Sequence, residues 1–266
     1  MSVMSHLRAG SGQPILFIHG IGGAARMFQP QIDHYAGRGF EAIACDLPGY
    51  GGQPPLQSVT FNMLCDALET LIDGLSLDRP VLVGHSLGGM IVQSYLRRHP
   101  QAAAAAVLSG TSPAFGNPNG EFQRQFLADR LGPLDAGHTM PEIASDLVAM
   151  MVGEAPDPEG LALATECLAA TPPETYRAMM HCLVSFDERE NLAEIAIPVL
   201  CLAGEHDHNA PALMMQRMAE RIPGARYHLL AGAGHLANVE QPEASNAAID
   251  AFLDELAADT QQRAQP

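Results

Sequence analysis

The sequence contains no lysine. Its 14 basic residues are all arginines, set against 30 aspartates and glutamates, and the net charge is −16. A surface of this sign repels nucleic acids and anionic lipids, and the arginines form no cluster that would offset it. No stretch reaches the ~18 uninterrupted apolar residues that a membrane-spanning helix needs. These absences predict a protein that binds neither nucleic acid nor membrane.

Paired cysteines and a secretion signal are also missing. The five cysteines are odd in number, widely spaced and free of any Cys-x-x-Cys motif. Cys45 and Cys201 stand in apolar runs, where cysteine behaves as a small hydrophobic residue. The first 14 residues hold no apolar stretch of the kind found in secretory signals. We therefore expect a reduced, cytoplasmic protein.

Short apolar runs alternate with amphipathic segments along most of the 266 residues, a length sufficient for one large core. This alternation predicts an α/β protein with a doubly wound, mostly parallel sheet and helices on both of its faces. The expected strands fall within 14–20, 40–51, 80–86, 104–112, 197–207 and 225–235, and the expected helices lie at 28–37, 61–76, 87–99, 210–221 and 242–258.

The alternation is interrupted once, between residues 114 and 187. This segment has no convincing strand, and helices are expected near 118–131, 140–152, 158–170 and 173–185. In open α/β sheets, ligands bind at the carboxyl ends of the strands, and an inserted helical unit can roof that edge. We therefore expect an α/β core, 1–113 and 188–266, with a helical lid, 114–187, inserted into it.

One serine stands where an expected strand meets an expected helix, in the motif Gly84-His85-Ser86-Leu87-Gly88. Small neighbours permit a turn tight enough to expose Ser86 as a nucleophile. The amino terminus of the following helix also directs N–H groups and a positive dipole end towards the serine oxygen. The alternative interpretation is a glycine-rich turn with an idle serine.

A serine hydroxyl is a weak nucleophile at neutral pH and needs a base, which in turn needs an orienting acid. His235, in "AGAGHLANVEQP", follows the last expected strand, and Asp207, in "LAGEHDHNAP", follows the strand before it. Each could instead only cap or turn a loop, and Glu205 is the alternative acid. A metal site built on residues 205–208 is disfavoured because successive side chains of an extended segment diverge.

An acyl-transfer site also needs two N–H donors directed at the developing oxyanion. The amide of Leu87, directly after the serine, is one candidate. The amide of Ile21, in the glycine-rich loop after the first apolar run, is the other. Both would act through the backbone. The alternative for the Ile21 loop is a plain strand-to-helix turn.

Five motifs resemble those of the α/β-hydrolase-fold serine hydrolases, and the resemblance extends from about residue 13 to residue 256. It implies the α/β hydrolase fold, the chain order Ser86, Asp207 and His235 for the catalytic residues, and a loop-organising role for Asp46. The stretch 176–207 is similar to the carboxylesterase and enol-lactone hydrolase branch. The motifs are "HGIGG" (19–23), "DLPGYGGQ" (46–53), "GHSLGG" (84–89), "GEHD" with Ala-Pro (204–211) and "GAGH" with "EQP" (232–242).

Three departures from the family pattern carry expectations. Only about 13 residues precede Pro14, so we expect the leading strand of the sheet to be missing. His85 stands where relatives that hydrolyse carbon–carbon bonds tend to carry asparagine, which disfavours that activity. A serine nucleophile also argues against the epoxide hydrolase and haloalkane dehalogenase branches.

The predicted function is hydrolysis of a small to medium ester or lactone through an acyl-enzyme on Ser86, with no cofactor. Carbon–carbon hydrolysis, cofactor-free peracid formation and a ligand-sensing role for the same pocket stay open as alternatives. The expected partner is the small-molecule substrate, and the sequence leaves a homo-oligomer open. The candidate pocket residues are His19, His85, Met150, Met151, Arg124 and Arg177. Arg124, Arg130 and Arg177 are the candidate contacts for a substrate carboxylate.

Overall fold

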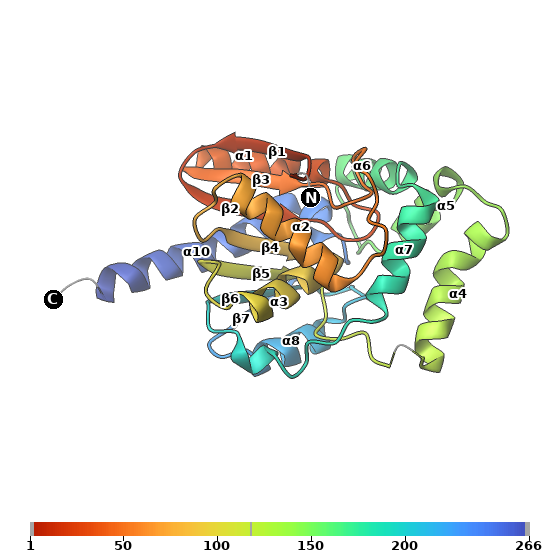
Figure 1. The fold of residues 1–266 in the computed structure, drawn as a ribbon. Coiled ribbons are helices and arrows are strands. Elements are labelled where there is room, and N and C mark those ends of the chain that lie inside the picture. Colours follow the sequence, from red (N-terminus) through yellow and green to blue (C-terminus); the bar gives the residue numbers. More distant parts are fainter. Residues whose placement is uncertain (1–2, 118, 264–266) are drawn as a thin grey trace.

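The structure is a computed structural model that describes residues 3–117 and 119–263. Its centre is a seven-stranded sheet in the order β1-β3-β2-β4-β5-β6-β7 (Figure 1). The strands from β2 to β7 are parallel, and β1 is antiparallel to β3. The bounds are β1 His6–Gly10, β2 Gln13–Ile18, β3 Phe40–Cys45, β4 Val81–His85, β5 Ala105–Ser109, β6 Val199–Gly204 and β7 Arg226–Leu230. The predicted fold class is confirmed.

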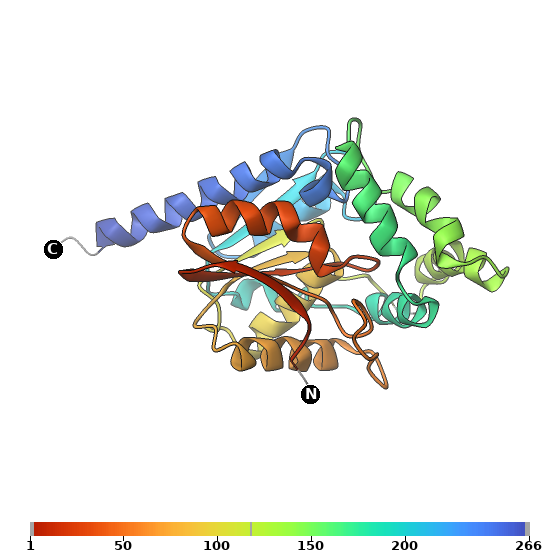
Figure 2. The ribbon, with the colours of Figure 1, turned by 90° about the horizontal axis from the view of Figure 1, so that it is seen from above.

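Helices cover both faces of the sheet because its central strands are apolar on both sides. In β2, Leu16 and Ile18 belong to one buried cluster, whereas Ile15 and Phe17 belong to the other. The first cluster includes residues of α2 (Phe61–Gly74), α3 (Leu87–Arg98) and α8 (Ala212–Arg221). The second includes residues of α1 (Gln29–Gly37) and α10 (Pro242–Arg263). Figures 1 and 2 show these two helical layers on opposite faces.

The leading strand is present, and the prediction that it is missing was wrong. β1 pairs with β3 over its whole length, from His6 opposite Cys45 to Gly10 opposite Glu41. The chain then reaches β2 through two residues, and Gly12 there has a φ of 128°, a value that favours glycine. No apolar run marks β1, because most of its side chains are half-buried or exposed at the sheet edge.

Four helices fill the chain between β5 and β6: α4 (Glu121–Asp135), α5 (Met140–Ala149), α6 (Pro158–Ala169) and α7 (Pro173–Leu183). Side-chain caps mark the amino-terminal ends of two of these helices. Thr139 and Glu142 form a capping box at α5, and the Asp157 carboxylate accepts the amide N–H of Gly160 at α6. The starts of α5, α6 and α7 agree with the sequence prediction. The first helix was expected near 118–131, and α4 begins at Glu121; residue 118 lies outside the described residues.

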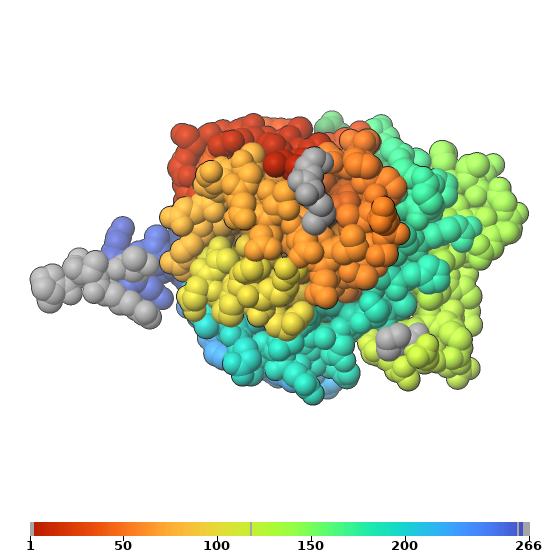
Figure 3. Space-filling model, viewed as in Figure 1, coloured from red at the N-terminus to blue at the C-terminus, as the bar shows by residue number. Residues whose placement is uncertain are grey.

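The four helices lie together beyond one end of the sheet (Figures 1 and 2), and α4 forms the outer edge in the space-filling view (Figure 3). At the base of this segment, Ala114 and Asp187 form an isolated antiparallel bridge. The Phe115 amide also donates to the Phe186 carbonyl over 2.9 Å. This pairing supports the proposed division into a core, 1–113 and 188–266, and a lid, 114–187.

Three short elements have no counterpart in the sequence prediction. They are the 3₁₀ turns η1 (Ala25–Phe28) and η2 (Leu192–Glu194), and the four-residue helix α9 (Ala237–Glu240).

All five cysteines are buried free thiols, and burial raises the pKa of Cys201 to about 12. Within the described ranges, no helix is both long enough and apolar enough to cross a bilayer.

Candidate active site

Ser86 occupies the turn between β4 and α3 in a strained conformation. Its φ of 53° and ψ of −118° lie outside the regions that non-glycine residues normally adopt, at a cost of about 1–3 kcal/mol. Two hydrogen bonds from β5 and the loop after it hold this turn. The Ser86 amide donates to the Ser109 carbonyl over 2.9 Å, and the Thr111 hydroxyl donates to the Ser86 carbonyl over 2.8 Å.

Two glycines make room for this turn, as the sequence predicts. A Cβ on Gly84 would lie 2.5 Å from the carbonyl oxygen of Gly88, which is too close for any side chain. A Cβ on Gly88 would collide with the Ile18 carbonyl oxygen at the end of β2. The glycines therefore allow α3 to approach β2 and β4 closely, which places Ser86 at the carboxyl end of the sheet.

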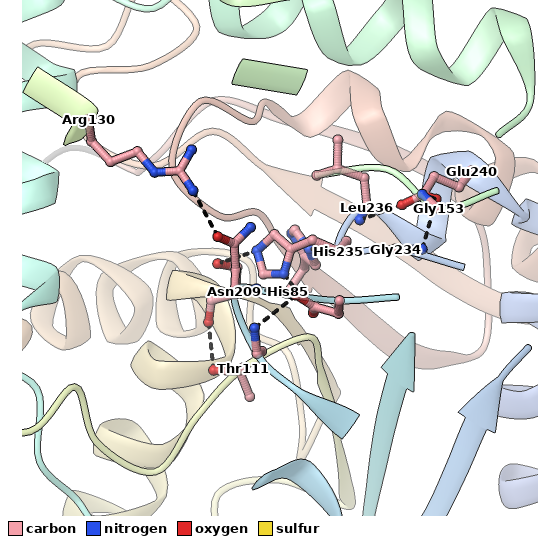
Figure 4. Close-up of polar contacts among 12 residues, drawn as sticks. His85, Thr111, Arg130, Gly153, Asn209, Gly234, His235, Leu236 and Glu240 are labelled. Atoms are coloured by element: carbon pink, nitrogen blue, oxygen red, sulfur yellow. Dashed lines mark hydrogen bonds and ion pairs between the residues drawn. The ribbon is translucent and has the colours of Figure 1, made fainter. Parts of the chain in front are cut away.

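The structure brings Ser86, His235 and Asp207 together in one hydrogen-bonded row (Figure 4 labels His235). His235 Nε2 lies 3.0 Å from Ser86 Oγ, and His235 Nδ1 lies 2.8 Å from Asp207 Oδ2. Asp207 and His235 are 3% and 6% exposed, so water competes little for these bonds. The Ser86 hydroxyl can donate to Nε2 when Nδ1 carries the imidazole proton.

Asp207 is held as a carboxylate. Its Oδ1 accepts the amide N–H groups of Asn209 and Ala210, both over 2.8 Å. Burial alone would raise the pKa of Asp207, but the contact with His235 and these two amides outweigh it and lower the pKa below 3.8. Because an ionised carboxylate can only accept hydrogen bonds, Oδ2 of Asp207 requires His235 to carry its proton on Nδ1, and in this tautomer Nε2 faces the serine as an acceptor.

Glu205, the alternative acid, points elsewhere: its carboxylate accepts the Gly232 amide over 2.9 Å. His206 lies 3.3 Å from the exposed carboxylate of Glu154. Across residues 3–117 and 119–263, no three His, Cys, Asp or Glu side chains are grouped to hold a metal ion.

The two proposed oxyanion donors belong to segments that adjoin Ser86. Leu87 is the first residue of α3, so its N–H has no acceptor within the helix. Ile21 follows Gly20, and a Cβ on Gly20 would lie 2.8 Å from Ser86 Cβ, so this loop touches the serine. The loop is closed by the Gly23 amide, which donates to the Gly20 carbonyl over 3.1 Å.

Asp46 holds the end of this loop, because its Oδ1 accepts the amide of Ala25, the first residue of η1, over 2.8 Å. Tyr50 and His19 also bond this loop, and the Tyr50 hydroxyl accepts the Gly22 amide over 3.4 Å. His19 Nδ1–H donates to the Gly20 carbonyl over 2.7 Å, and Nε2 accepts the Leu47 amide over 3.0 Å. Burial lowers the pKa of His19, which fits a neutral ring that bonds the backbone at both nitrogens.

His85 is also a neutral, backbone-bonded histidine. Its Nε2–H donates to the His235 carbonyl over 2.8 Å, and the two rings lie 4.9 Å apart (Figure 4). Burial, reinforced by the charge of His235, lowers the pKa of His85 to about 3. His85 therefore supports the main chain of the base.

Half of the predicted pocket residues line a cavity between the Gly20–Gly23 loop and the lid segment, and half do not. His19, His85 and Met151 line it. Met150 instead has a side chain that is 56% exposed, Arg124 donates to the Asn119 carbonyl, and Arg177 pairs with Asp135. The prediction of a pocket contact is thus not supported for these last three, because Met150 is turned to solvent and the two arginines bond other groups. The apolar lining comes from Ile21, Met27, Val148, Met151, Leu168 and Leu236.

Sequence reasoning missed two sets of contacts between the lid segment and the site. Arg130 of α4 donates to the Asn209 side chain over 2.9 Å, next to the loop that holds Asp207 (Figure 4). The carbonyl of Met151 accepts the His235 amide over 2.6 Å. The quoted motif "EQP" includes Glu240, whose carboxylate accepts amides of the same His235 loop.

A hydrogen-bonded serine, histidine and aspartate at the carboxyl ends of parallel strands is the arrangement found in α/β hydrolases. Comparison with known families agrees. The chain belongs to the α/β hydrolase fold family, whose model matches residues 13–242.

Individual relatives cover nearly the whole chain. An AB hydrolase superfamily protein, YisY, of Bacillus subtilis (strain 168) is 30% identical over 91% of this chain and 92% of its own length. The structure of a thermophilic esterase from Thermogutta terrifontis superposes with a TM-score of 0.84 at 26% identity, covering 95% and 93% of the two chains. The enol-lactonase from Burkholderia xenovorans LB400 gives a TM-score of 0.81 at 24% identity over 94% and 96%, which shows a shared fold.

The close approach at Gly88 predicts a large loss of stability in Gly88→Val. The added side chain meets the carbonyls of Ile18 and His19, and neither backbone can retreat without disturbing β2. We expect a loss of about 3 kcal/mol or more, seen as a melting temperature about 6–12 °C lower or as insoluble protein. Gly132→Ala in α4, where a Cβ has open space, is the control and should melt at or slightly above the wild-type temperature. A wild-type melting curve for Gly88→Val would contradict this account of the turn.

The neutral state of buried His85 predicts a pH-dependent stability. Because the folded pKa of about 3 is below the ordinary 6.5, the unfolded chain binds more protons between these values, and stability is lost as pH falls from 6.5. From pH 7 to pH 5 this one group should cost about 2 kcal/mol. Urea unfolding at both pH values should show that His85→Gln, whose amide can still donate to the His235 carbonyl, loses about 2 kcal/mol less than the wild type. If His85→Gln and the wild type lose equal stability between the two pH values, His85 is not the source of the pH dependence. The control is His138→Gln, at an exposed histidine, which should lose as much stability as the wild type.

Proposed function

We propose that this chain is a serine hydrolase that cleaves a carboxylic ester or lactone through an acyl-enzyme on Ser86. One observation carries the proposal: His235 Nε2 lies 3.0 Å from Ser86 Oγ while Nδ1 bonds the buried carboxylate of Asp207. A histidine in this position can take the serine proton as the oxygen attacks a carbonyl carbon.

The first half of the reaction transfers the acyl group. Ser86 Oγ bonds to the substrate carbonyl carbon while its proton passes to His235 Nε2, and the charge of Asp207 stabilises the imidazolium. The carbonyl oxygen becomes an oxyanion, for which the amides of Ile21 and Leu87 are the proposed donors. As the tetrahedral intermediate collapses, the bond to the alcohol oxygen breaks and His235 gives the alcohol its proton.

The second half uses the same groups with water. His235 Nε2 takes a proton from a water molecule as the water oxygen bonds to the acyl carbon. Collapse of the second intermediate breaks the bond to Ser86 Oγ, which recovers its proton from His235. The products are a carboxylic acid and an alcohol, or one hydroxy acid when the substrate is a lactone. These steps need only groups that the chain supplies.

The lining of the cavity favours an apolar acyl group. Met27, Val148, Met151 and Leu168 are among its lining residues, and methionine side chains adapt to irregular shapes. Since Arg124 and Arg177 bond elsewhere, the cavity offers neither of them for a substrate carboxylate. This favours an uncharged ester or lactone of small to medium size. The similarity to a solved esterase and a solved enol-lactonase supports the same class.

A panel of aryl esters with acyl chains of two to eight carbons, together with simple lactones, tests the proposal. We expect hydrolysis of short and medium chains by the wild type, and a loss of about 10⁶-fold in kcat for Ser86→Ala. Asp207→Asn should lose about 10⁴-fold because the imidazole tautomer is no longer fixed. Ser58→Ala, at an exposed serine, and Glu205→Gln should hydrolyse the esters at the wild-type rate.

Ester turnover that persists in Ser86→Ala would contradict the mechanism. Cleavage of a diketone, or peracid formation from hydrogen peroxide and a carboxylic acid, without ester or lactone turnover would favour the two alternative chemistries of the same site. Tight binding of a ligand with no turnover of any panel member would favour the ligand-sensing alternative.

A further inference from the structure

Three consecutive backbone amides, those of Gly234, His235 and Leu236, each donate a hydrogen bond to a fixed acceptor. Gly234 donates to Glu240 Oε2 over 2.9 Å, and Leu236 donates to Glu240 Oε1 over 2.8 Å. Between them, the His235 amide donates to the Met151 carbonyl over 2.6 Å. Figure 4 shows Glu240 facing this loop. The residue that carries the imidazole is therefore fixed on both sides by one carboxylate.

The same carboxylate also binds the lid segment. Glu240 Oε2 accepts a third amide, that of Gly153, over 2.7 Å. Glu240 is 3% exposed, and in the described ranges no arginine or histidine forms an ion pair with it. A buried charge without a counter-ion is tolerated only when hydrogen-bond donors surround it, and here three backbone N–H groups do so.

The connection between α5 and α6 lies directly against the His235 loop. A Cβ on Gly153 would meet the Gly232 carbonyl oxygen, and a Cβ on Gly234 would lie 2.6 Å from the Gly153 amide nitrogen. Two further backbone bonds continue the contact: Glu154 donates to the Gly232 carbonyl over 3.0 Å, and Asp157 donates to the Glu240 carbonyl over 2.9 Å. Segment 151–157 and the His235 loop thus form one backbone-bonded unit.

We infer that Glu240 is a positioning residue for the base: its two oxygens set the main chain on either side of His235 and couple the imidazole to the docked lid segment 151–157. This inference rests on the proposed function, because it concerns the reach of His235 to Ser86. Small displacements matter here, since a shift of about 1 Å in a reacting group can lower a rate by about 10²-fold.

Glutamine cannot reproduce this arrangement, although it has the same shape. Its single carbonyl oxygen can accept either the pair from Gly153 and Gly234 or the amide of Leu236. In both cases its NH₂ group faces an N–H that has lost its acceptor. Aspartate keeps both oxygens but is one methylene shorter. Glu205 offers a matched control, because its exposed carboxylate accepts only the Gly232 amide of the same loop, a bond that glutamine can keep.

The experiment compares wild type, Glu240→Gln, Glu240→Asp and Glu205→Gln, each as the full chain. It measures the rate constant for labelling Ser86 with a fluorophosphonate, kcat and KM on an aryl ester, and the melting temperature. We expect Glu240→Gln to lose about 10–100-fold in both the labelling rate and kcat, with KM within about threefold of wild type. Glu240→Asp should fall between wild type and Glu240→Gln, and Glu205→Gln should match wild type.

The parallel loss of labelling and kcat at nearly constant KM distinguishes positioning of the base from a purely structural contribution, which would lower only the melting temperature. A folded Glu240→Gln variant that is labelled within twofold of the wild-type rate would overturn the inference and leave the proposed function intact. If Glu240→Gln does not fold, Glu240→Asp decides by the same criterion. Absence of any adduct on folded wild type would overturn the inference and the proposed function together.

Discussion

The site depends on one contact, that between His235 Nε2 and Ser86 Oγ, which joins groups 149 residues apart. The sheet makes it possible because parallel strands end at the same edge, so that the ends of β4, β6 and β7 deliver three side chains to one place. The strained backbone conformation of Ser86 is the free-energy cost of placing its side chain at this edge. It is offset by the packing of β4 and α3, in which Gly84 and Gly88 bring backbone against backbone.

The core of this arrangement could be predicted from the sequence because it is encoded locally. Apolar runs followed by small residues marked the central strands, and the turn at Ser86 needs glycines at fixed positions. Asp207 and His235 were recognisable for the same reason, since each lies in the loop that follows a strand. The edge strand β1 was missed because its half-exposed residues leave no apolar run to detect.

The substrate pocket could be predicted much less well, because it depends on which face of a lid helix turns inward. Met150 and Met151 are neighbours of the same chemistry, yet one is 56% exposed and the other lines the cavity. The role of Glu240 was equally hidden, since its three partners are backbone amides, which every sequence contains. Contacts of this kind are specified by tertiary packing and carry no residue-type signal.

Detection of the covalent intermediate tests the central claim most directly. Wild-type protein mixed with an aryl ester, quenched in acid within the first turnovers and digested, should yield a peptide containing Ser86 that is heavier by one acyl group. Under the same conditions Ser86→Ala should give no acylated peptide and no initial burst of the released phenol. Steady hydrolysis by wild type with no acyl group on Ser86 at any quench time, or with an acyl group on another residue, would contradict the account.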